Sequence, residues 1–223
     1  MKALSLLLLA FFLYGGFAHA ETPKTPQLIF TWEALNFFPS DYQGKALATP
    51  HTPVRVGLMA TQNNKVVDLS AIPLRWYMDD TFLGEGLGLV NKTVTIKKSP
   101  GDSHYVRVTF PWNGAQTQGG VRIPIGNFLT VIETPVANTA VYGEQNLSLN
   151  AIPYFFNISS LSDLVFSWQV NDTKYYDQKT NTLSLHISAP NPGETRTVQA
   201  STIVQNKKNP LEFTKESIKF TAQ

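Results

Sequence analysis

The segment WYMDDT, Trp76 to Thr81, decides the fold because it recurs as WQVNDT, Trp168 to Thr173, 92 positions later (168 minus 76). In both copies apolar and polar residues alternate around the tryptophan, which is typical of a strand with one face buried. A pair of Asp or Asn residues then separates it from a second short strand. These residue types tolerate the left-handed backbone angles of a tight hairpin. Each copy therefore predicts a buried tryptophan followed by a hairpin turn.

The repeat extends along the chain. The tripeptide PGD at Pro100 returns as PGE at Pro192, again 92 positions later (192 minus 100), and flanking apolar positions align at 91. A one-residue insertion in a loop explains the difference, and similarity at this period indicates two copies of one domain-sized unit. We place the boundary near Gly126 and Asn127, which gives domains of residues 21–126 and 127–223.

Further alternating strands are predicted in both copies, separated by turn residues and without helical periodicity: 93–96, 105–110 and 121–125 in the first, and 183–187, 197–204 and 217–221 in the second. Strands at this spacing favour an antiparallel β-sandwich. About 200 residues suffice for two such cores.

The pattern resembles the immunoglobulin-like superfold, and in particular the cysteine-free Ig-like and PKD-like modules of exported bacterial envelope or surface proteins. The resemblance is based on RWYMDD and SWQVND, with the later PGD and PGE before an alternating strand, and it covers nearly the whole chain after residue 20. It implies an all-β fold of two tandem immunoglobulin-like antiparallel β-sandwiches. The chain has no Cys, so the disulfide of antibody domains is excluded.

Residues 1–20 are expected to be a secretory signal peptide. Lys2 precedes an apolar run from Leu4 to Phe17, and the segment Ala18-His19-Ala20 is a small-x-small cleavage pattern. The alternative is that the run stays uncleaved as an N-terminal anchor. After cleavage we expect no membrane span, and an exported protein of the periplasm, the cell surface or the extracellular space.

The charge balance and the residue types argue against several functions. Loss of Lys2 leaves 17 of the 18 basic residues against 16 acidic ones, a net charge near +1, whereas nucleic-acid binding needs a dense basic face. The tetrapeptide GDSH, Gly101 to His104, is interpreted as a turn and not as a triad. A Ca²⁺ site at the two hairpin turns is disfavoured because each offers only two side-chain ligands. We expect no enzymatic activity, no cofactor and no metal.

Candidate binding residues lie where the copies differ. The first copy has a long segment, Asn36 to Pro53, whose Phe37, Phe38, Tyr42 and Lys45 could form a contact surface for a partner. The alternative is that the two phenylalanines cap the sandwich and Tyr42 packs beneath its own loop. A second candidate set consists of aromatic residues that could stack on sugar rings: Trp112, Tyr175 and Tyr176. The alternative is that they are ordinary surface aromatics.

These observations predict a non-catalytic structural or binding module that meets a protein partner or a surface glycan through loops or an exposed sheet edge. Two alternatives stay open. A periplasmic pilus-assembly chaperone also has a signal peptide and two such domains, with Arg107, Arg122 and Lys219 as candidate cations. A carbohydrate-binding accessory module would use the second candidate set. Four Asn-x-Ser/Thr sequons matter only if the host glycosylates them: Asn91, Asn146, Asn157 and Asn171.

Overall fold

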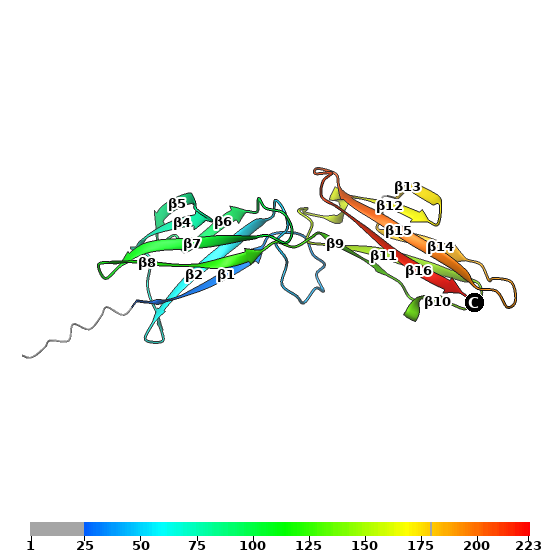
Figure 1. The fold of residues 1–223 in the computed structure, drawn as a ribbon, viewed down its shortest axis with the longest axis horizontal. Helices are drawn as coiled ribbons and strands as arrows, with labels where there is room; N and C mark the ends of the chain where they lie inside the picture. The colour runs from blue at the N-terminus through cyan, green and yellow to red at the C-terminus, as the bar shows by residue number, and fades with distance from the viewer. Residues whose placement is uncertain (1–24, 179) are drawn as a thin grey trace, which may run out of the picture.

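The structure, a computed structural model, describes residues 25–178 and 180–223, without the side chains of residues 176–178. The expected signal peptide lies outside these residues. The described chain consists of β-strands and two short 3-10 turns, arranged as two sandwiches placed end to end (Figure 1). This confirms the predicted all-β fold with two immunoglobulin-like sandwiches.

The first sandwich contains β1 (Gln27–Ala34), β2 (Pro53–Gln62), β3 (Lys65–Val66), β4 (Pro73–Met78), β5 (Thr81–Leu87), β6 (Asn91–Thr95), β7 (Ser103–Trp112) and β8 (Ala115–Pro124). In one sheet β2 pairs with β1 along one edge and with β6 and β3 along the other. The facing sheet has the order β5-β4-β7-β8, and all its pairs are antiparallel. Alternating side chains of both sheets meet in one core, as the sequence pattern predicts.

The second sandwich contains β9 (Leu129–Glu133), η1 (Ala137–Thr139), β10 (Ala140–Val141), β11 (Gln145–Tyr154), η2 (Leu161–Asp163), β12 (Leu164–Val170), β13 (Thr173–Gln178), β14 (Thr182–Ile187), β15 (Arg196–Asn206) and β16 (Phe213–Ala222). Its sheets have the orders β14-β11-β9 and β10-β16-β15-β12-β13. Strand β10 runs parallel to β16. In the first sandwich an isolated parallel bridge between Ala48 and Ile125 takes the corresponding place.

The repeated segment has one structure in both copies. Trp76 and Trp168 are 0% and 1% exposed, and a two-residue turn follows each strand. Asp79 and Asn171 open these turns with φ of 52° and 48°. The side-chain Oδ1 of Asp79 accepts the N–H of Tyr105 at 3.0 Å, and Asn171 Oδ1 accepts the N–H of Gln199 at 2.9 Å. The recurrence therefore marks architecture built twice.

Candidate functional site at the junction of the two sandwiches

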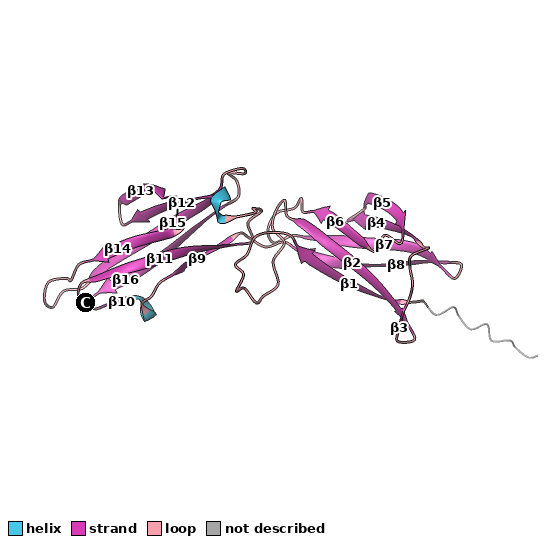
Figure 2. Cartoon of the chain, turned by 180° about the vertical axis from the view of Figure 1, so that it is seen from behind, coloured by secondary structure: helices cyan, strands magenta, loops and turns pink. Residues whose placement is uncertain are grey.

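The long segment from Asn36 to Pro53 lies where the two sandwiches meet, below the junction in Figure 2. Phe37 forms an antiparallel bridge with Phe156 of the second sandwich. The N–H of Phe37 donates to the carbonyl of Phe156 at 2.8 Å, and the N–H of Phe155 donates to the carbonyl of Phe37 at 2.6 Å. The segment predicted to contact a partner thus contacts the other half of its own chain.

Two consecutive phenylalanines enter different cores at this point. Phe155 is 3% exposed and packs in the core of the first sandwich, although it follows β11 of the second. Phe156 is fully buried in the second core, where its ring lies 5.3 Å from that of Phe128. Phe155 has a φ of 66°, a conformation that is unfavourable for a bulky residue. Its contacts with the first sandwich must compensate for this strain.

Tyr42 covers the same junction. Its ring lies 5.6 Å from both Tyr154 and Phe155 and 5.8 Å from Phe38, in each case edge to face. Its hydroxyl donates to the carbonyl of Lys45 at 3.2 Å. A Cβ at Gly44 would lie 2.3 Å from the Tyr42 hydroxyl, so only glycine leaves room for the ring beneath its own loop. This arrangement corresponds to the alternative in which Tyr42 packs under the loop.

A buried polar network joins the sandwiches beside these rings. Thr49 and Thr52 are both fully buried, with their hydroxyls 2.7 Å apart. The hydroxyl of Thr52 donates to Asn157 Oδ1 at 2.8 Å, and Asn157 Nδ2 donates to the carbonyl of Pro50 at 2.8 Å. Buried polar groups rigidify an interface when their hydrogen bonds are satisfied, because misalignment leaves them unpaired.

Glu212 supports this network from the second sandwich. It is 2% exposed, and its carboxylate accepts hydrogen bonds from the backbone N–H and the side-chain Nδ2 of Asn157. Asn157 is therefore held by both domains. A glycan on this sequon would displace the contacts with Thr52 and Glu212, so the folded junction is incompatible with glycosylation at Asn157.

The linker between the domains is held by contacts with the Asn36 to Pro53 segment. The N–H of Gly126 donates to the carbonyl of Ala48 at 2.8 Å, and a Cβ at Gly126 would lie 3.0 Å from Leu47. Lys45 places its Nζ 3.4 Å above the centroid of the Trp32 ring, and burial lowers the pKa of this amine. The hydrogen bond to Ala48 and the close approach of Leu47 restrict the hinge motion that Gly126 would otherwise allow.

The predicted site residues are thus distributed over several places. Phe37 and Tyr42 contact residues of the second sandwich at the junction, while Phe38 remains 38% exposed. Trp112 is half-buried against the first core, and its Nε1 is buried. Tyr175 is 39% exposed on β13 of the second sandwich, and the side chain of Tyr176 lies outside the described part of the chain. The structure does not bring Trp112 and Tyr175 together.

The three cations considered for a chaperone cleft do not converge either. Arg107 and Arg122 lie on the outer face of the sheet formed by β5, β4, β7 and β8, where Arg122 donates to the Ser103 hydroxyl at 2.8 Å. Lys219 lies on β16 of the other sandwich, opposite Gln199. The three side chains are therefore not positioned to bind one carboxylate together, as the chaperone cleft would require.

His104 and Asp79 form a structural pair in the first sandwich. Burial raises the pKa of Asp79, but hydrogen bonds from the Tyr105 N–H, from His104 and from Lys98 outweigh it and lower the value to about 2. His104 is 3% exposed, and its Nε2 accepts the N–H of Lys97 at 3.1 Å. Its Nδ1 must then hold the proton that it shares with Asp79 Oδ2 at 2.9 Å. Both carboxylate oxygens of Asp79 are therefore engaged by protein donors.

This pair predicts acid sensitivity of the first sandwich. The pKa of Asp79 is lower in the folded chain than its ordinary value of 3.8, so its stabilisation is complete above that value and is lost as the pH falls towards 2. Asp79→Asn should remove this part of the pH dependence. At pH 7 it should also cost about 1–3 kcal/mol, because an amide group would face the N–H of buried His104.

The measurement is thermal unfolding of each sandwich, followed by NMR between pH 7 and 2. The second sandwich, which has Asn171 at the corresponding place, serves as the internal reference. An Asp79→Asn variant that loses stability in acid as steeply as the wild-type chain would contradict the assignment.

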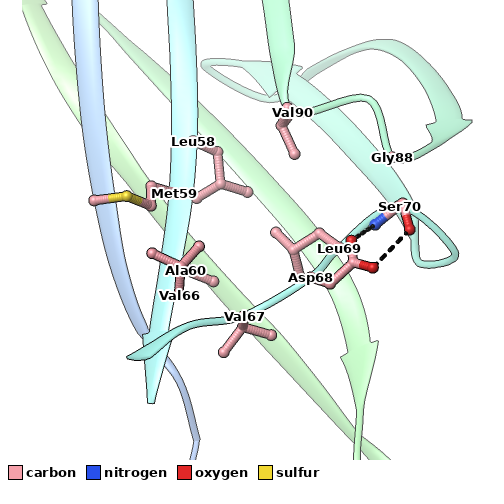
Figure 3. Close-up of a pocket in the computed structure, with 10 residues that line it drawn as sticks. All are labelled: Leu58, Met59, Ala60, Val66, Val67, Asp68, Leu69, Ser70, Gly88 and Val90. Carbon is pink, nitrogen blue, oxygen red and sulfur yellow. Dashed lines mark hydrogen bonds between the residues drawn. The ribbon is translucent and has the colours of Figure 1, made fainter. Parts of the chain in front are cut away.

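A hollow of about 470 Å³ opens beside β3, as Figure 3 shows. Leu58, Ala60 and Leu69 line it and also complete the first core, while Met59 extends away from the other lining side chains. Asp68 accepts hydrogen bonds from the N–H and the hydroxyl of Ser70 at 2.9 and 3.0 Å, and these bonds lower its pKa. The carboxylate thus serves to shape its own loop.

Sequence reasoning missed the residues that the second sandwich contributes to the junction: Tyr154, Phe155, Phe156, Asn157 and Glu212. A signal was present. The turn after β2 begins Asn63-Asn64-Lys65, whereas the positions 91 residues later (154 minus 63), at the end of β11 and directly after it, read Tyr154-Phe155-Phe156. Three aromatics in place of a polar turn indicate a buried contact at that end of the domain.

Comparison with known proteins adds the following. No protein-family model matches the chain, and no curated protein matches it by sequence. Among solved structures, three N-terminal domains of the highly immunogenic outer capsid protein (Hoc) of bacteriophage RB49 match 89% of the chain at 8% identity, with a TM-score of 0.43. The chain spans 59% of that structure's length.

Two further structures match at similar levels. Fibronectin(III)-like modules of Clostridium thermocellum CbhA match 87% of the chain and 94% of their own, at 12% identity and a TM-score of 0.29. The titin domains z1z2, solved in complex with telethonin, match 91% and 98%, at 10% identity and a TM-score of 0.30.

Within residues 25–178 and 180–223, no group of three or more His, Cys, Asp or Glu side chains could hold a metal ion. In the same residues no helix is long and apolar enough to cross a membrane.

Proposed function

We propose that the chain is an exported, non-catalytic module of a bacterial-type cell envelope or surface, in which two sandwiches form one stiff rod that presents binding surfaces to a protein or a glycan. The observation that supports this best is the junction. Phe155 and Phe156 enter opposite cores, and Asn157 is bonded from both sides. A flexible tether would need none of these buried contacts.

The N-terminal pattern of Lys2, an apolar run and Ala18-His19-Ala20 supports export. The absence of Cys is compatible with any redox compartment, since neither core relies on a disulfide. The His104 and Asp79 pair supports a non-catalytic role because its polar atoms stabilise a turn and a strand end.

Stiffness is tested by residual dipolar couplings of the chain from Glu21 to Gln223. We expect one alignment tensor to fit both sandwiches. Asn157→Ala should separate the two tensors, because it removes the bonds to Thr52 and to the Pro50 carbonyl. Asn146→Ala is the matched control, since this exposed asparagine bonds His186 away from the junction. Independent tensors in the wild-type chain would overturn the rod.

Export is tested in the native host with a C-terminal tag, cell fractionation and N-terminal sequencing. We expect the wild-type chain outside the cytoplasm, with Glu21 as its first residue. A variant that lacks residues 2–20 should stay in the cytoplasm. Recovery of the wild-type chain in the cytoplasm with residues 1–20 intact would refute the exported role while leaving the stiffness result unaffected.

A further inference from the structure

The outer face of the sheet β5-β4-β7-β8 displays a row of aromatic and cationic groups. The strand registers place Phe82, Tyr77, Arg107 and Gly120 side by side, one from each strand. The rings of Phe82 and Tyr77 lie 5.5 Å apart, and the guanidinium carbon of Arg107 lies 4.4 Å from the centroid of Tyr77. Cross-strand neighbours on one face are in contact, so this row forms a continuous strip.

The next row adds a ring and a second cation. Tyr105 of β7 is paired with Arg122 of β8. A Cβ at Gly120 would lie 2.8 Å from the Tyr105 ring, so the glycine lets this ring lie down on the sheet. Phe82 and Tyr105 remain 55% and 38% exposed. The sheet therefore presents flat rings to solvent, and their apolar surface is exposed to water.

A hollow of about 230 Å³, lined by both polar and apolar side chains, borders the strip on the same sheet. Arg75 and Glu85 line it, joined by an ion pair of 2.8 Å, together with Thr109 and Gln116. Arg75 is paired with Thr109 across β4 and β7. Such groups supply both donors and acceptors, which suits a ligand rich in hydroxyl groups.

The second sandwich shows that the fold does not need these rings. The corresponding row there consists of small or polar residues: Lys174, Gln169, Ser201 and Ser217. The place of Tyr105 is taken by Gln199, since it is bonded to Asn171 as Tyr105 is bonded to Asp79. The aromatics of the first sandwich thus require an explanation beyond folding.

The charges on this face favour an anionic ligand. Among the described residues neither Arg107 nor Arg122 forms an ion pair, whereas Arg75 is neutralised by Glu85. Stacking on Tyr77 fixes the plane of the Arg107 guanidinium, and a guanidinium held in this way can bind a carboxylate with two parallel hydrogen bonds.

We propose that this face, made of Tyr77, Phe82, Tyr105, Arg107 and Arg122, binds an acidic polysaccharide whose sugar units bear carboxylates. The C–H faces of the sugar rings stack on the exposed rings of Phe82 and Tyr105, since C–H bonds point positive charge at the negative π-face. The carboxylates pair with the two arginines, and the hydroxyl groups reach the hollow beside Arg75 and Glu85. This deepens the proposed function, because it rests on a module that presents a surface to a glycan.

The test uses the full chain from Glu21 to Gln223 and isothermal titration with polygalacturonate. A neutral β-glucan, poly-L-glutamate and an oligodeoxythymidylate of matched length serve as comparisons. We expect polygalacturonate to bind with the lowest Kd of the four. Added salt should weaken this binding without abolishing it, because stacking is not screened.

The residues of the strip are tested by replacing them with the residues at the corresponding positions of the second sandwich, which the same fold accommodates. Tyr77→Gln with Tyr105→Gln should raise the Kd for polygalacturonate about tenfold or more. Arg107→Ser should raise the Kd and flatten its salt dependence. Gln169→Ala, on the corresponding face of the second sandwich, should leave both unchanged. Circular dichroism melts serve to check that each variant remains folded.

Several results would overturn the proposal: no binding of polygalacturonate, equal or tighter binding of poly-L-glutamate or the oligonucleotide, equal binding of the neutral glucan, or unchanged affinity in the Tyr77→Gln, Tyr105→Gln variant. The titration does not depend on export or on interdomain stiffness. Its failure is therefore distinguishable from failure of the proposed function.

Discussion

Phe155→Ala is expected to lower the free energy of unfolding of the first sandwich by about 3–5 kcal/mol, although the residue belongs to the chain segment of the second. The reason is its position in the first core, where it is 3% exposed and contacts Tyr42. Alanine is also unfavourable at a φ of 66°, so the substitution mainly reports lost packing.

Phe156→Ala is the matched comparison. It removes the same side chain one position later and should destabilise the second sandwich, because its ring packs with Phe128. Hydrogen exchange followed by mass spectrometry separates the two cases, since it reports amide protection in each set of strands. If Phe155→Ala lowered protection only in β9 to β16, the assignment of this ring to the first core would be wrong.

The same contact implies that the first sandwich depends on the second. A chain that ends at Gly126 lacks both Tyr154 and Phe155, so it exposes the core surface that they cover. The two sandwiches thus share a fold, but the core of the first is completed by residues of the second, whose own core, among the described residues, contains none from the first.

Much of the fold could be predicted from local patterns. The alternation of apolar and polar residues around Trp76 and Trp168 indicates their strands. The turns at Asp79 and Asn171 follow from residue types that accept a positive φ. These features depend on neighbours in sequence. The β4–β5 and β12–β13 hairpins were accordingly placed without any knowledge of the tertiary structure.

The candidate sites were harder to predict because they depend on contacts between distant segments. Nothing local to Phe37 reveals that its backbone pairs with Phe156, more than a hundred residues away. Tyr77, Phe82 and Arg107 come from three strands, and only the strand registers show that they form one strip. The sequence groups Trp112 and Tyr175 only as aromatics that could stack on sugar rings, whereas in the structure they lie on β7 and β13 of different sandwiches.

The two repeated tryptophans provide a test of buried hydrogen bonding in a nearly identical setting. Trp76→Ala and Trp168→Ala should each destabilise their own sandwich by about 3–5 kcal/mol, since both side chains are fully buried. Substitution by phenylalanine should distinguish them. Trp76 Nε1 donates to the carbonyl of Leu89 at 2.7 Å, whereas the buried Nε1 of Trp168 has no hydrogen-bond partner among the described residues.

Trp76→Phe leaves the Leu89 carbonyl without its donor, while Trp168→Phe removes a donor that was already unpaired. The first substitution should therefore cost about 1–3 kcal/mol more than the second, the penalty for an unsatisfied buried polar group. Hydrogen exchange in each sandwich measures both values in one chain. Equal costs would show that the Trp76 hydrogen bond contributes nothing beyond packing, and that the two copies differ in sequence but not in the energetics of their cores.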